Sequence, residues 1–260
     1  MKIAVLASGS SGNFTFVSGA GSSILVDAGT CCRTVCSALA SIGQSASGID
    51  GVFITHDHSD HVKALATLEK KHGFSMPLYA TDGTIEAVCA AVGEKACEWP
   101  WTSIAPGEPF RIGALEIEAF SVPHDAADPV GCVISDGAVR YGIATDLGSV
   151  PESVRFHLRD CDALSLEFNH DSEMLMQSSR PWSLKQRISG RSGHLCNCDA
   201  AALLAQVATP RLKAVFPVHL SAECNAPHLA LDAAREAVGS LGLDPAIIRE
   251  PRYPTPVVEL

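Results

Sequence analysis

The segment from His56 to His61, which reads H-x-H-x-D-H, is the part of the sequence best suited to chemistry. It follows directly on the apolar run 51–55, which is typical of a buried strand. In an extended backbone alternate side chains point to the same side, so His56 and His58 would project together. Asp60 and His61, at the expected turn into a helix, would add a carboxylate and a third imidazole. Such a group favours a divalent metal site over a packed core or a polar loop.

Four further aspartate and histidine residues each stand at the end of a short apolar run. They are Asp27, His124, Asp146 and His219. With the segment 56–61, their order and spacing resemble the five ordered motifs of the metallo-β-lactamase superfamily, over nearly the whole chain. The flanking segments resemble its WalJ/YycJ-like branch, which is described as phosphodiesterase or exonuclease-like; they are Ser8–Asn13, His124–Gly131, Asn169–Asp171, Gly193–Leu195 and His219–Ser221.

The resemblance implies a site for two divalent ions. One ion would be held by His56, His58 and His124, and the other by Asp60, His61 and His219, with Asp146 bridging the two. A carboxylate bridge keeps both positions ligated by nitrogen and oxygen, which suits zinc, manganese or iron. Asp27 would bind no metal and would instead orient a ligand imidazole through its other nitrogen.

The implied reaction is hydrolysis of a phosphodiester. A hydroxide shared by the two ions would attack phosphorus while Asp60 helps to position it. In phosphodiesterases of the superfamily, a histidine that is not a ligand lies between the bridging aspartate and the last ligand, and His194 matches that position. Its imidazole would protonate the leaving alkoxide, the alternative being a structural role. For His170, a substrate-pocket role and a structural role are equally open.

The Gly/Ser-rich loop from Ser8 to Asn13 offers three candidate phosphate contacts, Ser10, Ser11 and Asn13. However, the loop joins two expected strands and lacks both the lysine and the glycine spacing of known phosphate loops. A tight turn in the wall of the pocket is therefore the alternative.

Positive charge is concentrated between Arg180 and Arg191, a segment with four basic residues and no acidic one. The other 248 residues carry 15 basic and 29 acidic side chains, and the whole chain has a net charge of −10. Because the segment adjoins His194, Arg187 and Arg191 are candidates for drawing a nucleic-acid backbone to the metals, and Trp182 for stacking on a base. The alternative is a solvated helix face.

The composition predicts a globular chain. Of 260 residues, 47% are hydrophobic and 18% are charged, which lies outside the range of disordered sequences. The sequence has no repeat or linker that would divide it, so we expect one domain over residues 1–260. It has no apolar run of about 20 residues and no export signal, which predicts a cytoplasmic protein that does not bind membranes. Its ten cysteines are expected to be reduced.

Short apolar runs alternate with helical stretches along the chain. The expected strands are Ile3–Ala7, Phe14–Val17, Ile24–Val26, Val52–Ile54, Leu115–Phe120, Val130–Ser135, Tyr141–Ala144, Leu164–Leu166 and Ala214–Val218. The expected helices are Thr34–Ile42, Val62–His72, Thr84–Val92, Asp199–Val207 and His228–Leu241. Only one expected helix lies among the first four expected strands, which favours two mixed sheets over a doubly wound parallel sheet. We therefore expect an α/β fold, the four-layer αββα sandwich.

These observations predict a metal-dependent hydrolase, most simply a phosphodiesterase or nuclease that acts on DNA or RNA. One alternative is a hydrolase of a small cyclic phosphodiester or a thioester. The 41 residues after His219 leave little room for the helical substrate domain of the glyoxalase II group. Another alternative is a regulatory metal-binding module tied to envelope signalling. The complete ligand set counts against it, because a binding role needs no open water-activating site.

Overall fold

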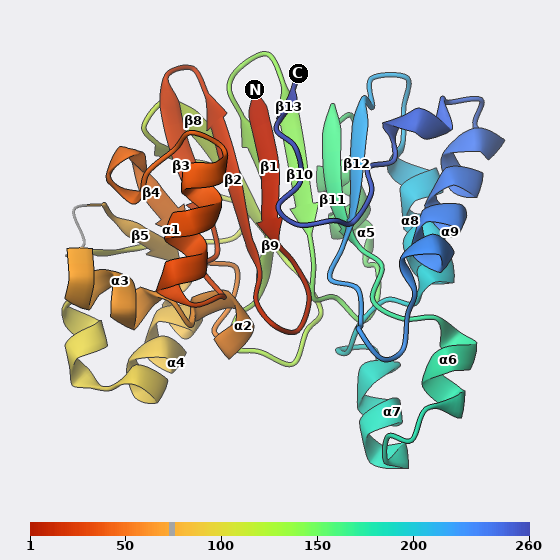
Figure 1. Cartoon of the computed structure of the whole chain (residues 1–260), viewed down its shortest axis with the longest axis horizontal. Helices are drawn as coiled ribbons and strands as arrows, with labels where there is room; N and C mark the ends of the chain where they lie inside the picture. Colours follow the sequence, from red (N-terminus) through yellow and green to blue (C-terminus); the bar gives the residue numbers. More distant parts are fainter. Residues whose placement is uncertain (73–75) are drawn as a thin grey trace.

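The computed structural model describes residues 1–72 and 76–260, and within them the strands form two sheets that lie face to face (Figure 1). The first sheet has the order β13-β1-β2-β3-β4-β5-β6. Its strands are β1 (Lys2–Ala7), β2 (Phe14–Gly19), β3 (Ser22–Val26), β4 (Gly51–Phe53), β5 (Leu78–Ala80), β6 (Trp101–Ser103) and β13 (Val258–Glu259). The second sheet has the order β12-β11-β10-β9-β8-β7. Its strands are β7 (Phe110–Ile112), β8 (Leu115–Ser121), β9 (Val130–Ser135), β10 (Arg140–Ala144), β11 (Ala163–Glu167) and β12 (Ala214–Val218).

Helices cover the outer faces of both sheets, which confirms the expected αββα architecture (Figure 1). Beside the first sheet lie α1 (Cys32–Ser41), α3 (Leu65–His72) and α4 (Asp82–Val92). Beside the second lie α5 (Glu152–Leu158), α8 (Asn197–Val207) and α9 (Pro227–Ser240). The short segments are α2 (Ser59–Val62), α6 (Ser172–Gln177), α7 (Trp182–Ile188), η1 (Ala46–Gly48), η2 (Glu94–Glu98) and η3 (Pro245–Ile247). None of the helices in the described ranges is both long and apolar enough to cross a membrane.

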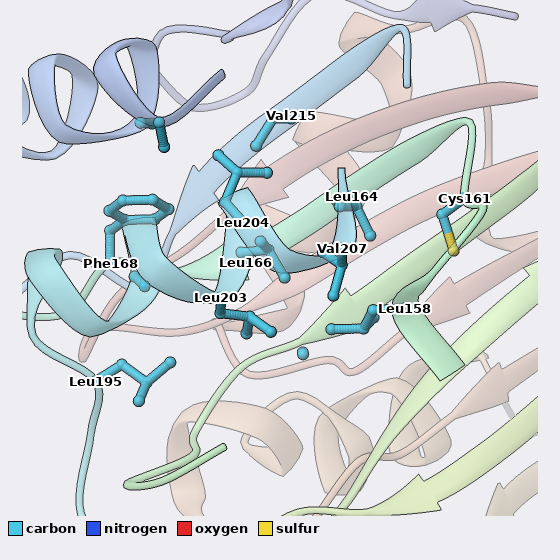
Figure 2. Packing of buried hydrophobic residues seen from close by; sticks show 14 of the residues in the cluster. Leu158, Cys161, Leu164, Leu166, Phe168, Leu195, Leu203, Leu204, Val207 and Val215 are labelled. Atoms are coloured by element: carbon cyan, nitrogen blue, oxygen red, sulfur yellow. The ribbon is translucent and has the colours of Figure 1, made fainter. Parts of the chain in front are cut away.

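Apolar side chains fill each of the three interfaces between layers. The interface between the sheets is built on large buried residues such as Phe53, Tyr141 and Phe216. Outside the second sheet, α8 packs Leu203, Leu204 and Val207 against apolar side chains of β11 and β12 (Figure 2). Burial of this kind contributes about 25 cal/mol per Å² of apolar surface and holds the strand ends in fixed relative positions.

All nine expected strands are present, but the sequence analysis missed β5, β6, β7 and β13. These strands have only two or three residues each, too few for alternation of polar and apolar side chains to be visible. The expected helix Val62–His72 is in fact broken, because α2 ends at Val62 and α3 begins at Leu65. The segments α5, α6 and α7 were also missed, since helices of six or seven residues give little periodic signal.

Candidate metal centre

The predicted ligands meet at one edge of the sandwich because they follow the carboxyl ends of strands that run in the same direction. In the first sheet, β3 and β4 are parallel and lead to Asp27 and to the segment 56–61. In the second sheet, β10, β11 and β12 are parallel, and Asp146 and His219 follow β10 and β12. His124 follows β8. Since β8 and β10 are both antiparallel to β9, β8 runs in the same direction as β10. The site therefore lies between the two sheets.

Three histidines form a first cluster, His56, His58 and His124, whose nearest ring nitrogens all lie within 4.8 Å of one another. His124 Nδ1 donates to the carbonyl oxygen of Gly193 at 3.1 Å. Its Nε2 is thereby left facing the cluster, 3.3 Å from His58 Nδ1. On His56, Nδ1 lies 3.0 Å from the Thr55 hydroxyl, which leaves Nε2 available.

A second cluster joins Asp60, His61 and His219, again with one candidate ligand atom from each within 4.8 Å of the others. Asp60 Oδ2 lies 3.7 Å from His61 Nε2 and 3.6 Å from His219 Nε2. Behind this cluster, Asp27 Oδ2 lies 2.8 Å from His61 Nδ1, as the resemblance implies. Asp27 also accepts from the Thr55 backbone N–H and hydroxyl, which fixes the carboxylate in place.

Asp146 lies between the two clusters. Its Oδ1 is 3.3 Å from His219 Nε2 and 3.8 Å from His124 Nε2, while its Oδ2 is 3.3 Å from His61 Nε2. Asp27, Asp146 and His219 all have left-handed backbone, with φ of 64°, 58° and 59°. This conformation costs residues other than glycine about 1–3 kcal/mol, and such residues often cluster at functional sites.

Unpartnered buried atoms test whether this donor set fits a metal. Among the described residues, His56 Nε2, His219 Nε2 and Asp146 Oδ2 are buried and have no hydrogen-bond partner. Buried polar atoms in native proteins almost always have one, so three exceptions around a single point need an explanation. Imidazole nitrogens and carboxylate oxygens that converge on one point are suited to divalent cations. The residues present therefore fit the implied metal.

Glu167, the last residue of β11, is a site residue that the sequence analysis missed. It is fully buried, and its Oε1 lies 2.7 Å from His194 Nδ1 and 3.1 Å from His219 Nδ1. Its Oε2 accepts from the backbone N–H groups of Leu147 and Leu195, each at 3.1 Å. Burial alone would raise the pKa of Glu167, but the two histidines outweigh it and bring the pKa to about 2. The available signal was an acidic residue at the end of an apolar strand, as at Asp27.

His194 faces the same cavity as the two clusters. Its ring centroid lies 5.2 Å from that of His124 and 5.3 Å from that of His219. Burial would lower the pKa of His194, but the Glu167 carboxylate outweighs it, so the pKa is raised. Because Nδ1 faces Glu167, Nε2 is the nitrogen left to exchange a proton in the cavity. His170, by contrast, is buried and contributes nothing to the described cavity wall.

The cavity above the clusters has a volume of about 180 Å³. Ser10 contributes to its wall, and the segment that contains α7 contributes Arg180, Leu184, Arg187 and Ile188. A larger cavity of about 640 Å³ lies along the C-terminal segment, away from the predicted site residues. Because candidate metal ligands and His194 line the smaller cavity, this cavity is the candidate site.

The predicted substrate residues divide into two groups. Ser10 and Arg187 line the cavity, and Arg187 Nε lies 2.5 Å from Asp125 Oδ2. Ser11 and Arg191 are exposed and are not part of the described wall. The Asn13 amide is buried beneath the site and donates to Asp60 Oδ2 at 3.2 Å. These contacts favour a positioning role for Asn13, while its contact with phosphate stays a prediction.

The basic segment 180–191 is not a uniformly solvated helix face. Lys185 is buried and donates to the Met176 carbonyl oxygen at 2.6 Å, and Arg180 Nε lies 3.1 Å from Glu223 Oε2. Trp182 is 63% exposed and lies outside the described cavity wall. The segment therefore places two arginines at the cavity and an aromatic ring outside it.

Comparisons with known proteins agree with this geometry. The sequence pattern of the Beta-lactamase superfamily domain matches residues 22–220. The exodeoxyribonuclease YycJ of Bacillus anthracis is 34% identical over 230 residues, which is 88% of this chain and 86% of that protein. The exodeoxyribonuclease WalJ of Streptococcus pneumoniae (D39) is also 34% identical, over 88% of this chain and 85% of that protein. Among solved structures, Zn²⁺-bound PqqB from Methylobacterium extorquens shares the fold with a TM-score of 0.73 and 20% identity, and the match covers 100% of both chains.

Proposed function

Because the chain belongs to the metallo-β-lactamase superfamily, we propose that it is a metal-dependent nuclease that hydrolyses the phosphodiester bonds of nucleic acid. The observation that carries this proposal is the complete set of seven candidate donors, five of which line one cavity together with His194 and Arg187. The names of the relatives, which match most of this chain and most of their own length, support DNA as the substrate.

The proposed cofactors are two divalent ions, zinc, manganese or iron. The first would be held by the cluster His56, His58 and His124, the second by Asp60, His61 and His219, with Asp146 shared between them. Two such ions would supply Lewis-acid chemistry, since they lower the pKa of water and stabilise charge on phosphate oxygens.

The side chains of this protein would orient the metal ligands and transfer a proton to the leaving group. Asp27 and Glu167 each accept from the Nδ1 of a ligand histidine, and the Gly193 carbonyl does the same for His124. These contacts direct each Nε2 to the cavity and raise the basicity of the ring. His194, held at Nδ1 by Glu167, would deliver a proton from Nε2 to the leaving oxygen of the substrate.

A second candidate is a hydrolase of a small cyclic phosphodiester, because the same donors and His194 would act on that reacting group, and the volume of the cavity does not separate the two substrates. A space of about 180 Å³ is below the range of about 300–1,000 Å³ that is usual for small-molecule sites. One nucleotide at the end of a strand would also enter it only in part. Both substrates contain a phosphodiester. They differ in whether a nucleic-acid strand is attached to it.

A hydrolysis panel tests the proposal. Protein loaded separately with each metal would be incubated with end-labelled single- and double-stranded DNA and RNA, a cyclic nucleotide, a chromogenic phosphodiester and a thioester. We expect nucleotides to be released from DNA, and Asp146→Asn to abolish release. Arg187→Ala should raise KM for an oligonucleotide and reduce its salt dependence by about one counterion, with little change for the chromogenic substrate. Turnover of the small substrates alone would favour the second candidate.

We include a cytoplasmic location in this proposal. Nucleic acid is available there, and ten cysteines in 260 residues suit a reducing compartment. Fractionation of cells followed by detection of the protein tests it, and recovery in an exported fraction would contradict it.

A further inference from the structure

A helical arm projects from the sandwich beside the candidate site. It runs from the start of α6 at Ser172 to Gly193 and connects β11 to α8, and Figure 1 shows α6 and α7 lying beyond the ends of the strands. The arm carries four basic residues and one acidic residue, in a chain with a net charge of −10. It is therefore a positively charged extension on an acidic protein.

The arm has a cavity side and an outer side. On α7, the residues in the cavity wall are Leu184, Arg187 and Ile188. Arg187 stands five positions after Trp182 on the helix, which corresponds to a rotation of about 140°. Trp182 therefore points away from the wall, and it is 63% exposed. Met176 on α6 is exposed as well, at 45%.

We propose that Trp182 forms a second binding subsite, which stacks on a base of single-stranded nucleic acid outside the cavity. The inference rests on the proposed function, because the strand would be the one whose end lies at the metal centre. Because Trp182 points away from the cavity wall, the base stacked on it would belong to a nucleotide other than the one at the reacting bond.

Continuity with the cavity supports a nucleic-acid strand as the occupant. Arg180 lines the cavity and stands only two residues before Trp182, the first residue of α7, so the arginines of the cavity wall and the aromatic ring lie on one continuous stretch of chain. The acidic partners of Arg180 and Arg187 are Glu223 and Asp125, and in each ion pair one partner is exposed, Glu223 in the first and Arg187 in the second. Such pairs contribute little to stability, so phosphates can displace the carboxylates. Positive charge interleaved with an exposed aromatic ring is the pattern of single-strand binding surfaces.

Tryptophan fluorescence of the metal-free protein tests the subsite without cleavage. Trp99 is buried and Trp101 half-buried, so Trp182 should report most of the quenching when an oligothymidylate of about ten nucleotides is added. Affinity would be measured in parallel by anisotropy of the labelled oligonucleotide. Trp182→Ala should weaken binding about fivefold or more, whereas Trp182→Phe should lose the quenching and keep most of the affinity.

The matched control is Phe156→Ala, because Phe156 is an aromatic residue on α5 that is 69% exposed and lies outside the arm. This variant should bind the oligonucleotide as the wild-type protein does. With metal restored, Trp182→Ala should raise KM for the oligonucleotide but leave turnover of a chromogenic phosphodiester unchanged. Equal affinity of Trp182→Ala and wild type would overturn the inference, and so would a loss of small-substrate turnover.

Two further outcomes separate this inference from the function. If Trp182 is quenched by the oligonucleotide but no nucleic acid is hydrolysed with any metal, the subsite stands and the nuclease proposal fails. If DNA is hydrolysed and Trp182→Ala has no effect on binding, the nuclease proposal stands and the subsite fails. A fluorescence change with anionic lipid vesicles and none with the oligonucleotide would assign the ring to a membrane surface, and the inference would again fail.

Discussion

Two buried carboxylates hold the histidines of the site from behind, one from each sheet. Asp27 contacts one imidazole, that of His61, whereas Glu167 contacts two, those of His194 and His219. One oxygen of Glu167 therefore fixes a predicted metal ligand and the predicted proton donor at once. Any change in this carboxylate should alter metal binding and proton transfer together.

Glu167→Gln tests this dual contact. All four groups that face the Glu167 oxygens are donors, so an amide must direct its own N–H₂ at two of them. We expect about a 10–100-fold loss in metal affinity and in kcat, measured by metal titration and by turnover at saturating metal. The matched control is Asp162→Asn, which changes a buried carboxylate just before β11, paired with Arg211. It should reduce stability alone, and equal losses of metal in both variants would contradict the assignment.

At the scale of single residues, the sequence could predict a motif whose residues are close together in the chain. It could not predict contacts between residues that are far apart in the chain. The segment 56–61 concentrates four candidate ligands in six positions, so spacing alone identifies it. Glu167 reaches His194 and His219 from 27 and 52 positions away, and only the fold brings these residues together. The solvent exposure of Trp182 and the burial of Lys185 likewise depend on how α6 and α7 pack.

At the scale of elements, two glycines allow the end of the arm to pack closely against the candidate site. A Cβ atom on Gly193 would lie 2.2 Å from the carbonyl oxygens of Arg187 and Ile188, and one on Gly148 would lie 2.3 Å from the Gly193 nitrogen. The Gly193 carbonyl in turn accepts from His124. The close packing thus couples the end of α7 to the first cluster of histidines.

Gly193→Ala should therefore displace the arm and release His124. We expect a loss of about 2 kcal/mol or more in unfolding free energy, because backbone atoms must move to admit the methyl group. Metal affinity should fall as well, which denaturant melts and metal titration would measure together. Gly48→Ala is the control, since a Cβ atom there meets nothing closer than 3.8 Å. Normal metal affinity in a folded Gly193→Ala protein would show that the arm and the site are independent.

The longer elements were predictable because burial imposes a period on them. Strand β8 alternates buried and exposed residues over most of its length, and α8 and α9 present buried residues at helical spacing. The short strands β5 and β6 sit beside parallel neighbours and are defined by hydrogen bonds to them. The start of α6 depends on a cap, in which the Asp171 side chain accepts from the Met174 backbone N–H. Such a single contact has no periodic signature in the sequence.

At the scale of the whole molecule, the candidate metal centre connects the two sheets. The segment 56–61 belongs to the first sheet, while His124, Asp146 and His219 extend from the second. Each cluster of three ligands draws residues from both sheets. The sequence could predict two sheets and a set of candidate ligands, but which sheet each candidate comes from required the strand order. One domain over residues 1–260 stays a prediction.

Metal bound across the two sheets should stabilise the folded chain, because the unfolded chain lacks the assembled site. At a free metal concentration about 100 times Kd, the expected gain is about 2.7 kcal/mol, which corresponds to a rise in Tm of roughly 5–10 °C for a chain of this size. Calorimetry with and without chelator would measure the shift, and elemental analysis should find about two equivalents of metal per chain. Asp146→Asn should lose most of the shift, since Asp146 lies close to His61 and His219 of one cluster and to His124 of the other. Reconstituted protein that never exceeds one equivalent with zinc, manganese or iron would reject the two-ion centre, whatever the thermal shift.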